Sequence, residues 1–257
     1  MINEEEKLTM PLKCIVVTGA SKGIGASIAR ALAEAGHHVA CVSRSGVAPS
    51  SEGLSDEAAK RLKGWTADVT RPETLKAVFT RLQSDGWQIK GLVNNAGMHV
   101  DAPSATLPME MWHQMMDANA TSVVTACQAA YPHLVSSGGG VIVNIGSFFE
   151  KLGVKRNLAY CASKAAVGAI TRVLAVEWGN KGIRVINVAP GYIETDLNAD
   201  AMEDGSPLRG YLSKRIPSGV PGKASDVAAL VAALFSPAGG FLSGETIYID
   251  GAQGIAH

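Results

Sequence analysis

The sequence predicts an α/β domain in which a doubly wound parallel sheet of about seven strands carries helices on both faces. Three observations support this fold class. Short apolar runs alternate with longer helical patterns along the chain, a glycine-rich turn follows the first apolar run, and no linker or internal repeat interrupts the alternation. Because βαβ crossovers are right-handed, repeated alternation restricts the topology to a doubly wound sheet. A length of 257 residues suits a single domain of this kind.

The predicted strands are short and apolar. The first run, Cys14–Val17, is apolar on both faces, as a strand buried in a parallel sheet requires. Similar runs predict the remaining strands at residues 39–43, 64–67, 91–94, 141–145, 184–188 and 246–249.

Helical patterns fill the intervals between these strands. The first runs from about Ile24 to Ala35 and stops at Gly36. The stretch from Ser45 to Ser55 is rich in Ser, Gly and Pro and predicts a loop. Further helices are predicted at about residues 72–82, 109–134, 160–178 and 226–235.

Composition excludes several function classes. Lys plus Arg equals Asp plus Glu at 23 each, so no electrostatic footprint for nucleic acid or an anionic membrane is present. The four cysteines are far apart and form no CxxC pair, which argues against a zinc site or a disulfide framework and favours a reducing cytoplasm. His99, His113 and His133 form no metal-ligand pattern, and no metal is expected. Met1–Met10 lacks the features of a secretory signal, and no apolar run approaches the roughly 20 residues that span a bilayer.

The turn Thr18–Gly25, TGASKGIG, lies between the first strand and the first helix. Glycine permits positive φ and a close approach of the backbone to a pyrophosphate, and free N–H groups at a helix N-terminus attract negative charge. The spacing G-x-x-x-G-x-G departs from the commoner G-x-G-x-x-G. In this context the turn predicts a dinucleotide-binding site.

Tyr160 and Lys164 stand four residues apart and therefore share one face of the predicted helix. A neighbouring ammonium stabilises a phenolate, so we expect Lys164 to lower the pKa of Tyr160 toward neutral pH and to make it an acid or base. Ser147 lies just beyond the strand 141–145, at the carboxyl edge where open sheets bind ligands, and its hydroxyl can donate to a substrate oxygen.

These motifs, in this order, resemble those of the short-chain dehydrogenase/reductase family. Thr18–Gly25 resembles the family's T-G-x-x-x-G-x-G, Asp68-Val69 its adenine-contacting D-V step, and Asn94–Gly97 its N-N-A-G motif. The spacing from Ser147 to Tyr160 also falls within the family's range. The resemblance covers about Lys13 to Ala252, and the nearest branch is similar to 3-oxoacyl-acyl-carrier-protein reductase.

The resemblance implies a Rossmann-type domain over residues 11–257, a tail over residues 1–10, and NADP(H)-dependent interconversion of a carbonyl and a secondary alcohol. Tyr160 would give its proton to the substrate oxygen, and Ser147 would hold that oxygen as charge develops. Lys164 would tune Tyr160 and bind the nicotinamide ribose. Asn119 would hold a water in the proton relay. A lid at about 196–215 carries Leu197, Met202, Leu208, Tyr211 and Leu212 and indicates a partly apolar pocket.

The cofactor preference is predicted from the end of the second strand. NAD-binding sites place an acidic residue there, but this chain has Ser43 followed by Arg44, whose guanidinium can meet a 2′-phosphate, with Lys22 as a second charge. NADP(H) is therefore preferred and NAD(H) remains possible, since Arg44 can instead be solvated or stack on adenine. The residues expected to contact the cofactor are Gly19, Ser21, Lys22, Gly23, Ile24, Gly25, Ser43, Arg44, Asp68, Val69, Asn95, Ala96, Gly97, Tyr160, Lys164, Pro190, Gly191, Ile193 and Thr195.

Three positions depart from the family pattern. One is the segment Phe148–Lys151, which is bulkier and more charged than the small residues often found there. The family often has I-S-S where this chain has Ile145-Gly146-Ser147, and Gly146 would add backbone freedom or room beside the substrate. The usual R-V-N is here Arg184-Val185-Ile186, with Asn187 one place later and therefore on the other side of the strand.

The substrate stays open at this point, because fold and motif do not choose among the family's 3-oxoacyl, sugar-alcohol, steroid and aromatic alcohol substrates. Phe148 and Phe149 either line an apolar pocket or simply pack. The sequence offers two interpretations of three nearby cations, Lys151, Lys155 and Arg156. They either bind an anionic substrate or carrier protein, or they lie on a solvated loop.

Other functions of the same superfamily are less compatible with the motifs. A non-enzymatic NADP(H) sensor would have no reason to retain Ser147, Tyr160 and Lys164 together. Enoyl reductases usually separate the Tyr and Lys by more residues, and sugar-nucleotide epimerases are usually longer.

The family resemblance also implies a homotetramer, because the family pairs its long central helices across a two-fold axis. The predicted helix 160–178 is rich in residues small enough for close approach, namely Ala162, Ala165, Ala166, Gly168 and Ala169.

Overall fold

The computed structural model describes residues 12–256 except 197, 199, 201, 202 and 204, so the predicted tail 1–10 lies outside the described residues. Its main sheet contains β1 Leu12–Thr18, β2 His38–Ser43, β3 Leu62–Thr66, β4 Trp87–Asn94, β5 Gly140–Ile145, β6 Ile183–Pro190 and β9 Thr246–Ile249. The spatial order of these seven strands is β3-β2-β1-β4-β5-β6-β9, and all neighbours pair in parallel. The predicted doubly wound sheet is confirmed.

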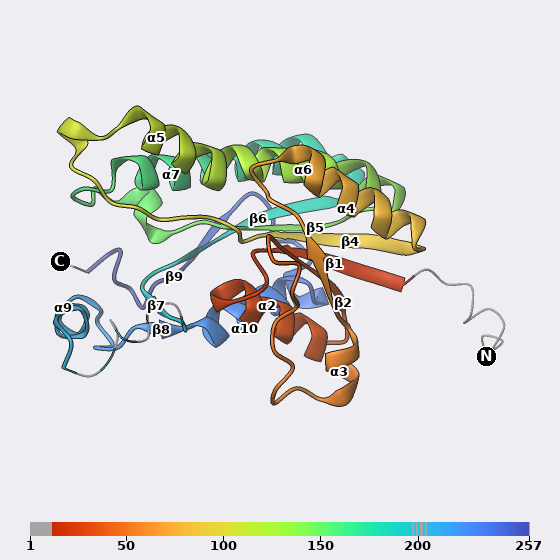
Figure 1. The fold of residues 1–257 in the computed structure, drawn as a ribbon, viewed down its shortest axis with the longest axis horizontal. Coiled ribbons are helices and arrows are strands. Elements are labelled where there is room, and N and C mark those ends of the chain that lie inside the picture. The colour runs from red at the N-terminus through yellow and green to blue at the C-terminus, as the bar shows by residue number, and fades with distance from the viewer. Residues whose placement is uncertain (1–11, 197, 199, 201–202, 204, 257) are drawn as a thin grey trace.

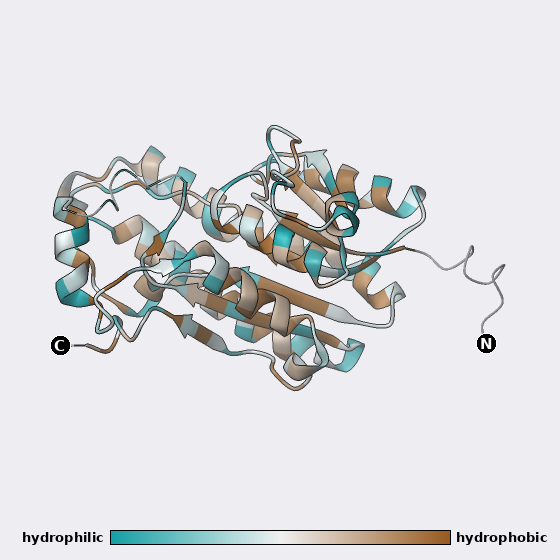
Figure 2. Cartoon of the chain, turned by 90° about the horizontal axis from the view of Figure 1, so that it is seen from below, coloured by the Kyte–Doolittle hydropathy of each residue, from teal (hydrophilic) through white to brown (hydrophobic). Residues whose placement is uncertain are grey.

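Helices cover both faces of the sheet (Figure 1). One face carries α2 Gly23–Glu34, α3 Asp56–Lys60 and α10 Ala224–Leu234, and the other carries α4 Pro72–Ser84, α5 Met109–Met116, α6 Ser122–Ser136 and α7 Leu158–Trp178. Each face has its own cluster of buried aliphatic side chains, and Figure 2 shows mainly apolar strands and helices that carry both apolar and polar residues. Single 3₁₀ turns lie at η1 Ser104–Thr106, η3 Phe148–Lys151, η4 Gly179–Lys181 and η5 Pro237–Gly239.

The segment after β6 forms a small separate unit. It contains the two-stranded sheet of β7 Ile193–Glu194 and β8 Gly222–Lys223, together with α9 Pro207–Arg215. Leu212 and Ile216 are buried there, with Tyr192 and Leu208 packed against them. The predicted lid falls on this unit, although Leu197 and Met202 lie outside the described residues.

The helix predicted at 109–134 is interrupted. A π-helical turn, η2 Asp117–Thr121, separates α5 from α6. A π turn inserts one extra residue, which rotates the following face of the helix and is frequent at functional sites. Here it places the side chain of Asn119 in the interior, where it is 1% exposed.

Three asparagines form a row across the sheet, which we call the asparagine row. Asn94 is in register with Asn144, and Asn144 is in register with Asn187. Asn94 Nδ2 donates to Asn144 Oδ1 at 2.9 Å, Asn144 Nδ2 donates to Thr171 Oγ1 at 2.8 Å, and Asn187 Nδ2 donates to Thr246 Oγ1 at 3.1 Å. All three side chains are buried on the face covered by α7.

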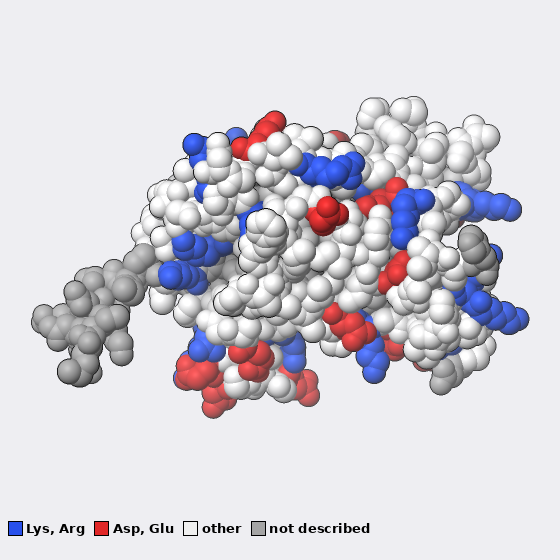
Figure 3. Space-filling model, turned by 180° about the vertical axis from the view of Figure 1, so that it is seen from behind, with Lys and Arg blue, Asp and Glu red and all other residues white. Residues whose placement is uncertain are grey.

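By length and composition alone, the stretch Leu158–Lys181 is apolar enough to cross a membrane. Helices from the core of α/β domains have the same composition, and here Ser163, Lys164 and Thr171 are buried against the protein interior. On the side of the molecule turned away from the viewer in Figure 1, Lys and Arg alternate with Asp and Glu without a continuous patch of one sign (Figure 3).

Candidate active site

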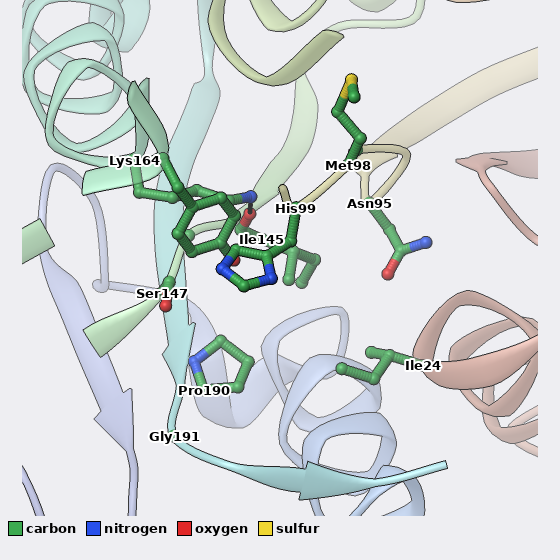
Figure 4. A pocket seen from close by; sticks show the side chains of 12 residues that line it. Ile24, Asn95, Met98, His99, Ile145, Ser147, Lys164, Pro190 and Gly191 are labelled. Atoms are coloured by element: carbon green, nitrogen blue, oxygen red, sulfur yellow. Dashed lines mark hydrogen bonds between the residues drawn. The ribbon is translucent and has the colours of Figure 1, made fainter. Parts of the chain in front are cut away.

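A cavity of about 260 Å³ opens at the carboxyl ends of β4, β5 and β6, beside the first turn of α2. It brings together eight residues that the sequence predicted for the site: Ile24, Asn95, Gly97, Ser147, Tyr160, Lys164, Pro190 and Gly191. Four further residues line it, namely Met98, His99, Ile145 and Gly146 (Figure 4). The position agrees with the rule that open α/β sheets bind ligands beyond the carboxyl ends of their strands.

Ser147 and Tyr160 approach the cavity from different elements. Ser147 caps η3 after β5, and its Oγ accepts a hydrogen bond from the Phe149 N–H at 3.3 Å. Tyr160 lies in the first turn of α7. Burial raises the pKa of Tyr160, and a hydrogen bond with Ser147 opposes this only in part. The expectation that the pKa of Tyr160 is lowered is therefore wrong, because loss of hydration destabilises the phenolate.

Lys164 lies on the same side of α7 as Tyr160, with its Nζ 5.7 Å from the centroid of the tyrosine ring. The ammonium donates to the carbonyl oxygen of Ile145 at 2.8 Å. Burial lowers the pKa of Lys164 to about 8, against an opposing effect of the Glu150 carboxylate. The same desolvation that raises the pKa of the tyrosine thus weakens the positive charge expected to lower it.

Asn119 connects the loop that follows β4 to α7 by hydrogen bonds. Its Oδ1 accepts from the Met98 N–H at 2.8 Å, and its Nδ2 donates to the Met98 carbonyl at 2.9 Å and to Ser163 Oγ at 3.1 Å. A methyl group at Gly97 would lie 2.8 Å from Asn119 Oδ1. The glycine of the N-N-A-G motif is therefore needed for this close contact.

The glycine-rich turn has the form of a phosphate cradle. Gly19 and Gly23 both have positive φ, and the residue before α2, Lys22, makes no side-chain cap hydrogen bond. The first N–H groups of α2 are thus left to an external acceptor. A methyl group at Gly25 would lie 2.3 Å from the Gly19 carbonyl oxygen. These residues fit the pyrophosphate of a dinucleotide, with Ser21 inside the same turn.

The end of β2 carries no carboxylate. Ser43 is buried with its Oγ 3.1 Å from Ser45 Oγ, while Arg44 is exposed. The pKa of Asp68 is lowered, first by hydrogen bonds from Thr70 and to a smaller degree by Arg44. Arg44 therefore lies near the predicted adenine step, Asp68-Val69.

Three further predicted cofactor residues, Ala96, Thr195 and Ile193, are held by contacts within the chain. The Ala96 N–H donates to Thr18 Oγ1 at 3.1 Å, and Thr195 N–H donates to Asn198 Oδ1 at 2.8 Å. Ile193 is buried in β7.

Two positioning side chains were missed by the sequence analysis. Thr18 Oγ1 also accepts from the Asn95 N–H at 3.0 Å, so it joins the first strand to the N-N-A-G loop. Ser163 is fully buried and donates to the Tyr160 carbonyl at 2.8 Å while it accepts from Asn119. Thr18 begins the recognised glycine motif and Ser163 precedes Lys164, so their positions in the motifs were the available signal.

Two of the three departures from the family pattern, at Gly146 and at Ile186-Asn187, are linked in space. A methyl group at Gly146 would lie 2.6 Å from Asn187 Oδ1 and 3.0 Å from Glu150 Oε2. Asn187 Nδ2 donates to the same Glu150 oxygen at 2.8 Å. Gly146 thus opens space for a neighbouring amide, and it also lines the cavity, so the expected room beside the substrate stays a prediction. Ile186 packs on the opposite face, in the cluster under α2 and α10.

The aromatic pair after Ser147 packs and does not line the cavity. Phe148 and Phe149 are 4% and 8% exposed. The Phe149 ring meets the Tyr160 ring edge-on at 5.8 Å, and the Phe148 ring meets Tyr192 at 5.7 Å. Phe149 therefore packs directly against the catalytic tyrosine candidate, and Phe148 packs against Phe149.

Two of the three nearby cations are engaged within the chain. Lys151 Nζ lies 3.6 Å from the centroid of the Tyr248 ring, and Arg156 Nε donates to Asp101 Oδ2 at 2.6 Å. These contacts favour the solvated-loop interpretation for Lys151 and Arg156.

Comparisons with known proteins agree with this geometry. A family model described as enoyl-(acyl carrier protein) reductase matches residues 19–252. The chain is 36% identical to 3beta-hydroxysteroid dehydrogenase 1 of Eggerthella lenta, over 93% of this chain and 92% of that protein. It is 35% identical to a 3-oxoacyl-[acyl-carrier-protein] reductase of Vibrio cholerae, over 93% and 96%. A putative 2-deoxy-D-gluconate 3-dehydrogenase from Agrobacterium tumefaciens, solved with bound NADP, is 32% identical with a TM-score of 0.81, over 95% and 97%.

Proposed function

The chain belongs to the short-chain dehydrogenase/reductase family and is an oxidoreductase acting on CH–OH groups, and from this premise we propose that its cavity interconverts a ketone and a secondary alcohol with NADP(H). The predicted family and reaction class are confirmed. The observation that carries the proposal is the placement of Ser147, Tyr160 and Lys164 in one cavity, next to Ile24, Pro190 and Gly191. A cofactor-binding sensor would have no use for those three side chains together.

The chain's own residues divide the work on the substrate oxygen. Tyr160 is protonated at neutral pH because burial raises its pKa, so it can donate a proton to the oxygen of a bound carbonyl. Ser147 adds a second donor, oriented before the reaction, where negative charge develops. Lys164, with a pKa of about 8, is charged at neutral pH and favours transfer of the proton away from Tyr160. NADPH, when bound, supplies the hydride.

A panel of candidate substrates tests the proposed reaction and identifies the compounds that the protein converts. Ketones, 3-oxoacyl thioesters, enoyl thioesters and secondary alcohols should be assayed with NADPH, NADH and the oxidised cofactors, with cofactor absorbance as the readout. We expect turnover of carbonyls or alcohols and none of enoyl thioesters, because Tyr160 and Lys164 stand only four residues apart. Turnover confined to enoyl thioesters, or cofactor binding without turnover of any compound, would contradict the proposed reaction.

The preference for NADP(H) rests on Ser43 and Arg44 together with the relative solved with NADP. Arg44→Ala is expected to raise KM for NADPH by about 10-fold or more and KM for NADH little, because only NADPH carries a 2′-phosphate for the guanidinium. Steady-state kinetics with both cofactors measures the ratio. Arg81→Ala on α4, whose partner is Asp85, serves as the matched control. Equal effects of Arg44→Ala on both cofactors would refute the assignment.

We also propose a homotetramer in the cytoplasm, as free cysteines and two exposed apolar surfaces suggest. Val173 and Val176 on the outer side of α7 are 54% and 84% exposed, and Phe241 and Leu242 beside β9 are also exposed. Two such surfaces allow two different two-fold contacts, as a tetramer requires. Light scattering at micromolar concentration should give four times the chain mass of 26.7 kDa, and a monomer mass would contradict the proposal.

A further inference from the structure

His99 holds a fixed orientation at the edge of the cavity. Its Nε2 lies 2.5 Å from Asn157 Oδ1, and its ring meets the Tyr160 ring edge-on at 4.6 Å. In Figure 4 the imidazole projects into the cavity toward Pro190. It is therefore close to the side chain proposed to transfer the proton.

The hydrogen-bond partners of Asn157 determine which nitrogen of His99 carries the proton. Asn157 Nδ2 donates to the Lys155 carbonyl at 2.9 Å, so its Oδ1 must be the atom that faces the imidazole. An amide oxygen only accepts, and His99 Nε2 must therefore donate. In the neutral imidazole this leaves Nδ1 as an acceptor, and no described residue donates to it.

The loop that carries His99 is fastened to the segment before α7. The Ala102 N–H donates to the Arg156 carbonyl at 2.8 Å, and Arg156 Nε donates to Asp101 Oδ2 at 2.6 Å. Asn157 itself is 9% exposed and lies directly before the helix of Tyr160. The imidazole acceptor is thus held at a constant place relative to the tyrosine hydroxyl.

We propose that His99 selects substrates that carry a hydroxyl group on the carbon next to the reacting carbon, by accepting a hydrogen bond from that hydroxyl at Nδ1. This inference rests on the proposed carbonyl–alcohol activity of the same cavity. Among the other side chains that line the cavity, Met98 and Ile145 are apolar, and Ser147 and Tyr160 are assigned to the reacting oxygen. The amide of Asn95 donates to the glycine-rich turn and is assigned to the cofactor. A ligand without a donor leaves the imidazole nitrogen unpaired once water is displaced.

The inference separates the substrate classes that the motifs leave open. Polyols and hydroxy ketones carry a hydroxyl beside the reacting carbon and satisfy Nδ1. A 3-oxoacyl thioester or a simple monofunctional alcohol has no donor there. The protein is thus assigned to vicinal diols and the corresponding hydroxy ketones.

A binding experiment tests the inference without depending on turnover. The affinities of cis-1,2-cyclohexanediol and cyclohexanol are compared by titration calorimetry, with the protein saturated with NADPH, which cannot oxidise either alcohol. We expect the diol to bind about 10-fold more tightly than cyclohexanol, because it makes one additional hydrogen bond to the otherwise unpaired Nδ1 of His99. His99→Phe keeps a ring against Tyr160 but removes the acceptor, and the preference should fall to about one. His113→Phe on α5, exposed and outside the cavity, should retain it.

A second variant protects the test against a folding defect. Asn157→Leu keeps the imidazole of His99 but removes the acceptor that holds its proton on Nε2. The proton can then also occupy Nδ1, so the diol preference should fall by a few-fold. Equal affinity of the two ligands for the wild type, or an undiminished preference in both variants, would overturn the role of His99. Failure of the oxidoreductase itself would show separately, as absence of any absorbance change in the substrate panel.

Discussion

Tyr160→Phe is expected to lower kcat by about 100- to 10,000-fold, the range of general acid catalysis. The substitution removes one hydroxyl and leaves a ring of almost the same shape between His99 and Phe149. Without the hydroxyl, the oxygen of the substrate has no proton donor, and Ser147 alone stabilises the developing charge. Stopped-flow or steady-state assays at saturating cofactor measure the loss.

Fold and cofactor affinity should survive this change, and thermal unfolding and cofactor titration check that they do. Tyr131→Phe is the matched control, since Tyr131 packs against Trp178 at 4.7 Å on the outer helix layer, away from the cavity. Retention of more than a tenth of the wild-type kcat in Tyr160→Phe would disprove the assigned role.

Gly146→Ala should reduce the free energy of unfolding by about 1–3 kcal/mol, the usual effect of overpacking a close-packed interior. The added methyl group would lie 2.6 Å from Asn187 Oδ1 and 2.8 Å from Asn187 Nδ2. Asn187 has no exposed surface and is held by Glu150 and Thr246, so it cannot withdraw freely. Because Ser147 follows directly, activity should fall as well. Chemical denaturation gives the stability difference.

A double-mutant cycle identifies the cause. In Asn187→Ala the space next to Gly146 is empty, so adding Gly146→Ala to that variant should have a much smaller effect than it has in the wild type. Gly153→Ala is the control, because nothing lies within 4 Å of the position of its added methyl group. Strict additivity of Gly146→Ala and Asn187→Ala would show that the two residues do not interact.

The sheet and the location of the cavity could be predicted from the sequence because each depends on local patterns. Apolar runs such as Cys14–Val17 and the glycine turn Thr18–Gly25 report burial and backbone conformation directly. The π turn at Asp117–Thr121 could not be predicted, since it depends on the bonds that Asn119 makes with Met98 and Ser163, far away in the chain.

Properties that depend on tertiary contacts also could not be predicted from the sequence. The spacing of Tyr160 and Lys164 predicts their proximity but not how far each is removed from water, and the direction of the tyrosine pKa shift was therefore wrong. Similarly, Gly146 and Asn187 are 41 positions apart in sequence, the difference of their numbers, and only the pairing of β5 with β6 makes them neighbours.

The asparagine row also bears on how the chain finds a single strand alignment. Next to these asparagines the strands are aliphatic, with Leu92 and Val93 in β4, residues 141–143 in β5 and residues 185–186 in β6. These aliphatic side chains distinguish poorly between neighbouring alignments while the sheet assembles. A shift of β5 by one residue would turn the amide of Asn144 toward the aliphatic cluster under α2 and α10 and away from Asn94 and Thr171. Each buried amide left without a partner costs about 1–3 kcal/mol. The asparagine row thus raises the free energy of misaligned sheets, which the aliphatic residues alone would tolerate.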